Sequence, residues 1–324
     1  MKKIISSIVI ALFFVPAFVS AQNTITLEIG SDLSAYQNCD SFESCPGFRD
    51  ALVEALTELL KQLLAEKIAE AQESVSDPVD YSDFQDATYQ VLSSGNLAGE
   101  NIGVVPEVIG NIWTDFKMVV PTEYLDTVSY VRVFYDDESD FLAHVKTSSD
   151  SRDTWELGVN LFHFNEASIV NEQRLVGTLV HEASHIITLS TDEIDISVSE
   201  RRCGTYYTVG GCAYKNSYIN EFIDAFWDND DFDNSEDIQD ESDENEKDEI
   251  ADDYFEKTGD YVTPYATWHP DEDIAESFAY FVLQDKPASD AKEVDAKLLF
   301  FHGYPELVTM RTNIRTNFAD LFNF

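Results

Sequence analysis

Asn171–Leu189 reads NEQRLVGTLVHEASHIITL, and this stretch decides the fold. Its apolar residues recur at intervals of three and four, which is the period of an α-helix. The apolar positions are Leu175, Val176, Leu179, Val180, Ala183, Ile186 and Ile187. Because they cover a wide surface, we expect this helix to be buried on more than one side.

The middle of this helix contains the pattern His181-Glu182-Ala183-Ser184-His185. Residues four apart lie on the same face of a helix, so the imidazoles of His181 and His185 can converge on one cation about 2 Å from each nitrogen. Glu182 then projects beside the metal and can act as general base for a water molecule that the metal activates. We therefore predict that His181 and His185 bind Zn²⁺ and that Glu182 is catalytic. A pair of inert, hydrogen-bonded histidines is the alternative.

A catalytic zinc ion needs a third protein ligand, and the best candidates follow His269 in the sequence HPDEDIAESFAYFV. Pro270 suits the first position of a helix, and the acidic residues after it suit the first turn. Glu272 and Glu276 share one helix face, so we predict that Glu272 binds the metal while Glu276 accepts the outer N–H of a ligating histidine. An exposed acidic first turn is the alternative, and Glu276 or Glu193 could replace Glu272 as ligand.

A HExxH helix followed by a helix bearing Glu-x-x-x-Glu resembles the gluzincin metallopeptidases, a plan that thermolysin and anthrax lethal factor share. Tyr261–Phe281, YVTPYATWHPDEDIAESFAYF, is also similar to a segment of uncharacterised secreted bacterial proteins described as zinc-binding peptidases. In the lethal-factor-like pattern a tyrosine lies seven residues before the glutamate ligand. Tyr265 occupies that offset, which implies that it stabilises the oxyanion, with His269 as the alternative donor.

The resemblance covers the two helices and little else. The interval from His185 to Glu272 is longer than in the compact members of the family, and Asp271 stands where thermolysin has Asn. The sequence does not match the metzincin motif, because Thr188 stands in place of its glycine and Thr191 in place of its third histidine.

Three stretches before the HExxH helix are predicted to be strands, because they are rich in β-branched and aromatic residues. They are Val128–Phe134, Phe141–Val145 and Trp155–Leu161. The last of them is a candidate edge strand for pairing with an extended peptide. The fold class that we predict is α+β, with a small sheet packed on the HExxH helix in a zincin-like catalytic domain of residues 123–324.

Residues 22–122 are predicted to form an N-terminal helical lobe. Its clearest element is Arg49–Val75, where leucines at helical spacing indicate a long amphipathic helix that packs in a core or, alternatively, binds a partner. The segment Tyr81–Val120 combines helical patches with turn signals such as Ser93-Ser94-Gly95, and we assign it to the same lobe.

The first 21 residues read as a cleaved secretory signal peptide, since two lysines precede an apolar run that ends in Val19-Ser20-Ala21. An uncleaved membrane anchor is the alternative. A signal peptide predicts a secreted or periplasmic protein with no membrane anchor in its mature form, and thiols pair in such compartments. The chain has four cysteines, and the closeness in sequence of Cys39 to Cys45 and of Cys203 to Cys212 predicts two local disulfides. A site of four thiolates around zinc is the alternative.

The charge balance is strongly acidic, with 62 acidic against 20 basic side chains and a formal net charge of −42. Phosphate backbones and anionic membranes would be repelled, so nucleic acid is not an expected partner. Acidic residues are densest at 228–253, where self-repulsion predicts an extended, solvated insertion unless cations bind it.

These observations predict a secreted zinc metallopeptidase that hydrolyses peptide or protein substrates. The alternative is a non-catalytic, zinc- or cation-binding secreted acidic protein. Replacing Glu182 by Gln distinguishes the two, because it should abolish hydrolysis and leave zinc binding intact.

Overall fold

The computed structural model describes residues 86–99, 107–138, 141–164, 169–322 and 324. The chain divides into two compact units, Met1–Asp77 and Pro78–Phe324, and all described residues belong to the second. The predicted signal peptide, the predicted helix Arg49–Val75 and the predicted pair Cys39–Cys45 lie outside the described residues. Within the described ranges, no helix has the length and apolar character needed to cross a membrane.

The fold is mixed α+β, as predicted, and its sheet is small and mixed. Its five strands lie in the order β2-β1-β3-β5-β4. They are β1 (Ala87–Val91), β2 (Leu97–Gly99), β3 (Val128–Phe134), β4 (Ala143–Thr147) and β5 (Trp155–Asn160). Only the β3–β5 pair among these is parallel, and the other pairs are antiparallel.

One face of the sheet is apolar because alternate residues of neighbouring strands are in register. Val131 of β3 lies opposite Leu157 of β5, and Val133 lies opposite Val159. All four side chains are at most 1% exposed. This alternation buries one face, and Arg132 and Gly158, which lie between these residues, are on the opposite face.

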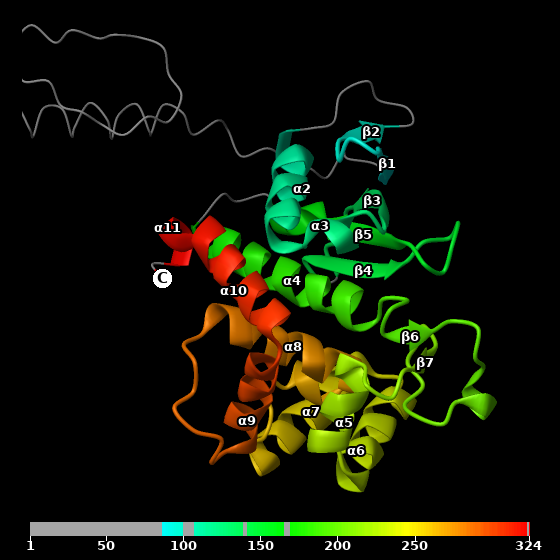
Figure 1. Cartoon of the computed structure of the whole chain (residues 1–324), viewed down its shortest axis with the longest axis vertical. Coiled ribbons are helices and arrows are strands. Elements are labelled where there is room, and N and C mark those ends of the chain that lie inside the picture. The colour runs from blue at the N-terminus through cyan, green and yellow to red at the C-terminus, as the bar shows by residue number, and fades with distance from the viewer. Residues whose placement is uncertain (1–85, 100–106, 139–140, 165–168, 323) are drawn as a thin grey trace, which may run out of the picture. The chain divides into compact units, whose positions relative to one another are not determined.

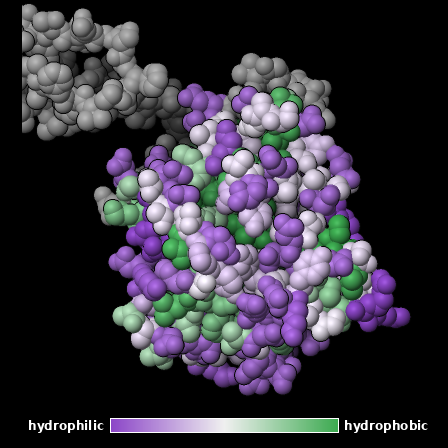
Figure 2. All heavy atoms as spheres, in the orientation of Figure 1, coloured by the Kyte–Doolittle hydropathy of each residue, from purple (hydrophilic) through white to green (hydrophobic). Residues whose placement is uncertain are grey.

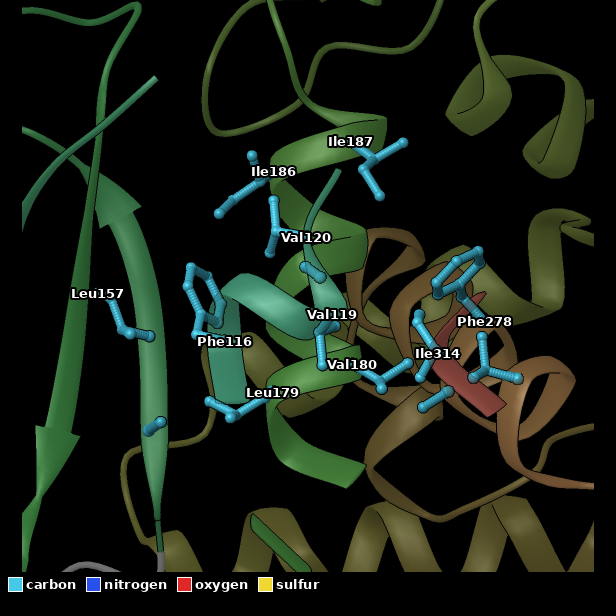
Figure 3. Packing of buried hydrophobic residues seen from close by; sticks show 14 of the residues in the cluster. Phe116, Val119, Val120, Leu157, Leu179, Val180, Ile186, Ile187, Phe278 and Ile314 are labelled. Carbon is cyan, nitrogen blue, oxygen red and sulfur yellow. The ribbon is translucent and has the colours of Figure 1, made fainter. Parts of the chain in front are cut away.

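The helix α4 (Ile169–Thr188) contains the HExxH pattern and runs between the sheet and the C-terminal helices (Figure 1). Leu179 lies on the side of Leu157 of β5 and Phe116 of α2 (Glu107–Val119), whereas Val180 faces toward Ile314 of α10 (Figure 3). Burial on two sides explains why its apolar surface is so wide.

The remaining helices follow α4 in the chain. They are α5 (Tyr218–Phe226), α6 (Asn229–Asp240), α7 (Glu244–Thr258), α8 (Pro270–Leu283), α9 (Glu293–Phe300), α10 (Pro305–Asn317) and α11 (Ala319–Phe322). Shorter elements are the helix α3 (Thr122–Leu125) and the strands β6 (Ile194–Asp195) and β7 (Cys212–Ala213). Several 3₁₀ turns are also present, among them η4 (Tyr265–Thr267).

The helical assignment of Tyr81–Val120 is wrong for its first part. β1 and β2 form a hairpin there, and Gly95 in the turn between them has a positive φ of 74°. Ser93-Ser94-Gly95 does form a turn, as predicted, but the turn connects two strands and not two helices. β1 pairs with β3, so the sheet draws on both sides of the boundary predicted between residues 122 and 123.

The prediction of an extended acidic insertion at 228–253 is also wrong, because α6 and α7 occupy it. Asp228 caps α6 in a capping box with Asp231, and Asp243 caps α7. Acidic side chains in a first turn are stabilised by the helix dipole, which offsets part of their mutual repulsion. Ile238 and Ala251 are buried and anchor the two helices, while the surface over α6 remains hydrophilic (Figure 2).

Candidate metal centre

Two helices that are distant in sequence, α4 and α8, pack side by side in antiparallel directions. His185 near the end of α4 approaches Glu272 in the first turn of α8, and Gly177 of α4 lies near Leu283 at the end of α8. α8 begins where the sequence predicts, with His269 as N-cap and Pro270 in the first turn. The packing of these helices therefore brings the predicted ligands together.

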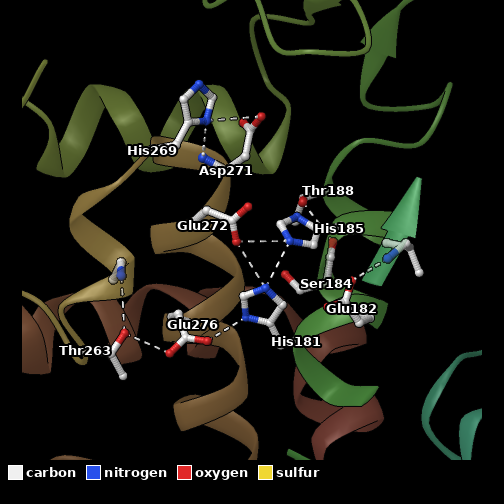
Figure 4. A network of polar contacts seen from close by, with 12 residues as sticks. His181, Glu182, Ser184, His185, Thr188, Thr263, His269, Asp271, Glu272 and Glu276 are labelled. Carbon is white, nitrogen blue, oxygen red and sulfur yellow. Dashed lines mark hydrogen bonds and ion pairs between the residues drawn. The ribbon is translucent and has the colours of Figure 1, made fainter. Parts of the chain in front are cut away.

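The ring nitrogens of His181 and His185 and a carboxylate oxygen of Glu272 converge on one point (Figure 4). The two Nε2 atoms are 3.1 Å apart, and Glu272 Oε2 lies 3.2 Å from that of His181 and 3.4 Å from that of His185. Glu272 Oε2 is a buried atom without a hydrogen-bond partner. This group can hold a metal ion.

Glu276 lies one turn beyond Glu272 and contacts the other side of His181. Its Oε1 is 2.6 Å from His181 Nδ1, and its Oε2 accepts a hydrogen bond of 2.8 Å from the hydroxyl of Thr263. When the ring of His181 is neutral and Nδ1 donates to this carboxylate, Nε2 is left with its lone pair toward the centre, which is the form that binds a metal ion. The contact with Thr263 was not foreseen, since a threonine in a loop carries no sequence signal for this position.

Glu182 is 6% exposed and is held by the sheet rather than by another side chain. The backbone N–H of Val145 in β4 donates a hydrogen bond of 2.7 Å to Glu182 Oε2. Burial raises the pKa of Glu182, and this hydrogen bond and the neighbouring imidazoles oppose the rise. A buried carboxylate with a raised pKa accepts a proton more readily than an exposed one.

Burial and neighbouring charges shift the pKa values of His181 and Glu272 in opposite directions. Burial lowers the pKa of His181, but the contacts of its ring nitrogens with the carboxylates of Glu272 and Glu276 outweigh that effect and hold the pKa well above its usual value. Burial raises the pKa of Glu272, and the two imidazoles outweigh it and bring that pKa below its usual value. Glu272 is thus an anionic oxygen donor within a group of buried imidazoles.

Tyr265 in η4 lines the same cleft as the three converging residues. Its ring centroid is 6.1 Å from that of His181 and 6.3 Å from that of Phe141. Burial, followed by the charges of Glu272 and Glu182, raises its pKa, so the phenol keeps its proton and remains a hydrogen-bond donor. The phenol of Tyr265 thus lies in the same cleft as the three converging residues.

His269, the alternative donor, points away from the centre (Figure 4). Its Nε2 lies 3.0 Å from the hydroxyl of Tyr206, and its Nδ1 lies 3.4 Å from Asp271 Oδ2. Asp271, one residue before Glu272, is buried on that same side, away from the three ligand atoms. These residues fix the start of α8 and contribute no ligand.

Glu193, the alternative ligand, lies elsewhere. Its Oε2 accepts a hydrogen bond of 2.7 Å from the backbone N–H of Tyr218 at the start of α5. The disulfide Cys203–Cys212 is present, as predicted, and it closes a loop that carries Tyr206 toward His269. The loop therefore supports the helix start rather than the centre itself.

A buried ion pair joins α9 to the residue that follows Glu272 in α8. Lys297 of α9 and Asp273 of α8 are both fully buried, with Nζ and Oδ2 2.8 Å apart. The Asp273 carboxylate also accepts hydrogen bonds from Trp227 and Ser277, and the Lys297 ammonium lies 3.7 Å from the ring centroid of Tyr261. These contacts anchor the first turn of α8, which also contains Glu272.

The three ligand atoms open onto a cleft of about 570 Å³ between α4, α8 and β4. Its lining includes Ala143, His144 and Val145 of β4, which is an edge strand of the sheet. The prediction that Trp155–Leu161 forms the free edge is wrong, because β5 is paired on both sides with β3 and β4.

Comparisons with known proteins found nothing: no family model, no curated protein and no solved structure matches this chain.

Proposed function

We propose that this protein is a zinc-dependent peptidase with a gluzincin-type, zincin-like catalytic domain. The observation that carries the proposal is the separation of the three ligand atoms, 3.1–3.4 Å. A tetrahedral zinc ion with bonds of about 2.0–2.1 Å keeps its ligand atoms about 3.3 Å apart. Two imidazoles and one carboxylate therefore fit zinc, and three protein ligands leave one position open to the cleft, as in catalytic sites.

Zinc bound in this site supplies Lewis acidity toward water and toward a substrate carbonyl group. Glu182 accepts the proton of the attacking water and passes it to the leaving amine, since it is buried beside both histidines. The hydroxyl of Tyr265 donates a hydrogen bond to the carbonyl oxygen as negative charge develops there. Glu276 holds the ring of His181 in its ligating tautomer.

The cleft suits an extended peptide as substrate. At the two ends of β4, the C=O of Leu142 and the N–H of Ser148 form hydrogen bonds with the β5 side of the sheet. The N–H of Val145 points away from β5 and donates to Glu182. The N–H and C=O of Ala143 and the C=O of Val145 thus also face away from β5, and a peptide strand can pair with these groups of β4. Such pairing places a peptide bond beside Glu182.

The experiment is the variant Glu182→Gln, compared with Glu172→Gln on the exposed surface of the same helix. We expect Glu182→Gln to bind one zinc ion per chain and to lose cleavage of a fluorescently labelled, unstructured protein by about 100-fold or more. The Glu172→Gln control should keep both properties. A wild-type protein that binds zinc and cleaves no peptide would refute the proposal and favour a non-catalytic, zinc-binding acidic protein.

We also propose that the protein is exported to the periplasm or the medium, which rests on the signal-like residues 1–21. The disulfide Cys203–Cys212 supports this, because disulfides persist in oxidising compartments. Mass spectrometry of the exported protein should find an N-terminus at residue 22.

A further inference from the structure

The disulfide-closed loop Cys203–Cys212 is attached to the segment that follows α4. Its end belongs to β7, which pairs with β6, and β6 begins six residues after α4 ends. Gly211 approaches β6 so closely that a Cβ there would lie 2.7 Å from the backbone oxygen of Asp195. The loop therefore lies against the segment that leaves the helix end carrying His185.

The same loop contacts the residue that begins α8. The hydroxyl of Tyr206 lies 3.0 Å from His269 Nε2, and the two ring centroids are 6.0 Å apart. The backbone of Tyr206 is fixed on both sides, because its C=O accepts a hydrogen bond of 2.9 Å from Ala213 N–H and its N–H donates one of 3.3 Å to Asn220 Oδ1. The fold of the loop thus decides where this hydroxyl lies.

His269 is the N-cap of α8, and both of its ring nitrogens have partners. Nδ1 accepts the backbone N–H of Asp271 at 3.3 Å, and Nε2 faces Tyr206. A phenol can donate or accept, so the hydroxyl of Tyr206 suits Nε2 in either tautomer of the ring. The backbone C=O of His269 accepts the N–H of Glu272 at 3.0 Å. The capped residue therefore begins the turn that presents Glu272 to the metal centre (Figure 4).

The loop consequently joins the two helix ends that supply the candidate ligands. α4 and α8 are antiparallel, so His185 near the end of α4 lies beside Glu272 at the start of α8, with 3.4 Å between Nε2 and Oε2. Ligands that are already held in position bind a metal ion more tightly than ligands that must be ordered when the ion arrives.

We propose that the loop Cys203–Cys212 clamps the metal centre, with Tyr206 as the positioning residue, so that zinc affinity depends on the hydroxyl of Tyr206 and on the disulfide. The inference rests on the zinc site of the proposed function and adds what regulates its affinity. Tyr206 acts through His269 and the first turn of α8, and it touches neither the metal nor the substrate.

The test is competition for zinc against a chromophoric chelator at fixed pH, with variants that are folded at the assay temperature. Tyr206→Phe removes one hydroxyl and should weaken zinc binding about fivefold, which corresponds to about 1 kcal/mol, the usual loss when a helix cap is removed. Replacing Cys203 and Cys212 together by Ser should weaken it at least as much, because the loop is then free to open. Tyr214→Phe is the matched control, since Tyr214 is 44% exposed, and it should bind zinc like the wild type.

A second background separates positioning from a general effect on the loop. His269→Asn gives α8 a cap that needs no support from Tyr206, because the Asn side-chain oxygen accepts a backbone N–H of the first turn directly. Adding Tyr206→Phe to His269→Asn should therefore leave zinc affinity unchanged. A hydroxyl that only stabilised the loop would cause the same loss in both backgrounds.

Wild-type zinc affinity in Tyr206→Phe or in the folded disulfide variant would overturn the inference, and so would a loss that persists beside His269→Asn. If the disulfide variant does not fold, the two tyrosine comparisons still decide. Cleavage of the labelled protein by the wild type is measured separately. Chelator-sensitive cleavage with a zinc affinity that ignores Tyr206 refutes the clamp and leaves the peptidase proposal standing. A zinc affinity that depends on Tyr206 in a protein that cleaves nothing has the opposite meaning.

Discussion

Removing Glu276 should weaken zinc binding although Glu276 is not a ligand. In Glu276→Ala the ring of His181 loses the acceptor 2.6 Å from its Nδ1, and the hydroxyl of Thr263 loses its partner. Loss of such a partner of a ligating histidine costs about 10- to 100-fold in metal affinity. This corresponds to about 1.4–2.7 kcal/mol of binding free energy.

The chemistry of the contact predicts a graded series. Glu276→Gln keeps an oxygen for Nδ1 and loses the negative charge, so its zinc affinity should lie between those of the wild type and Glu276→Ala. Thr263→Val removes one hydroxyl and should have a smaller effect, because the Glu276 side chain is 19% exposed and water can replace the lost donor.

The assay is competition for zinc against a chromophoric chelator of known affinity at fixed pH. Glu256→Gln is the control, since it removes a carboxylate from the exposed surface of α7 and should leave zinc affinity unchanged. If Glu276→Ala binds zinc as tightly as the wild type, then Glu276 does not orient His181 and the reasoning is refuted. If Glu256→Gln loses affinity equally, the effect is one of net charge.

Three further predictions concern stability. Removal of zinc by a chelator should lower the melting temperature, and zinc at about 100 times its Kd should restore about 2.7 kcal/mol of unfolding free energy. Equal melting curves with and without metal would contradict a zinc site in the folded protein. Replacing Cys203 and Cys212 together by Ser should lower the free energy of unfolding, measured by chemical denaturation, by about 2–3 kcal/mol, because the disulfide closes a loop over a separation of nine residues. An unchanged free energy of unfolding would mean that the disulfide does not restrain the unfolded chain. Lys297→Met should cost about 3–5 kcal/mol because it leaves Asp273 buried without its cation, and Lys292→Met on the exposed surface should cost little. A stable Lys297→Met protein would show that Trp227 and Ser277 alone satisfy that carboxylate.

Local patterns predicted the elements that hold the candidate site. The period of the apolar residues located α4 within two residues at its start, and Pro270 marked the start of α8. The choice of Glu272 and Glu276 followed from helical spacing, since residues one turn apart share a face. These features depend on neighbours in the chain, which a sequence displays directly.

Contacts between distant segments were not predictable in the same way. The pairing of β1 with β3 depends on the buried face of the whole sheet, so Tyr89 reads as helical or extended until its partner is known. The hydrogen bond that orients Glu182 comes from the backbone of Val145, and a backbone donor has no residue type to identify it. In α6 and α7, helix caps and a few buried anchors outweighed a composition that suggested disorder.

The ion pair between α8 and α9 also limits where insertions in this part of the chain can be accommodated. Lys297 reaches the carboxylate next to Glu272 from a helix that begins ten residues after α8 ends. A one-residue shift within α9 would turn its side chains by about 100° and leave both charges without a counterion in the interior. Insertions in the exposed part of the connection, at 288–291, preserve that register, so we expect the protein to accept a change of length there without loss of its metal site.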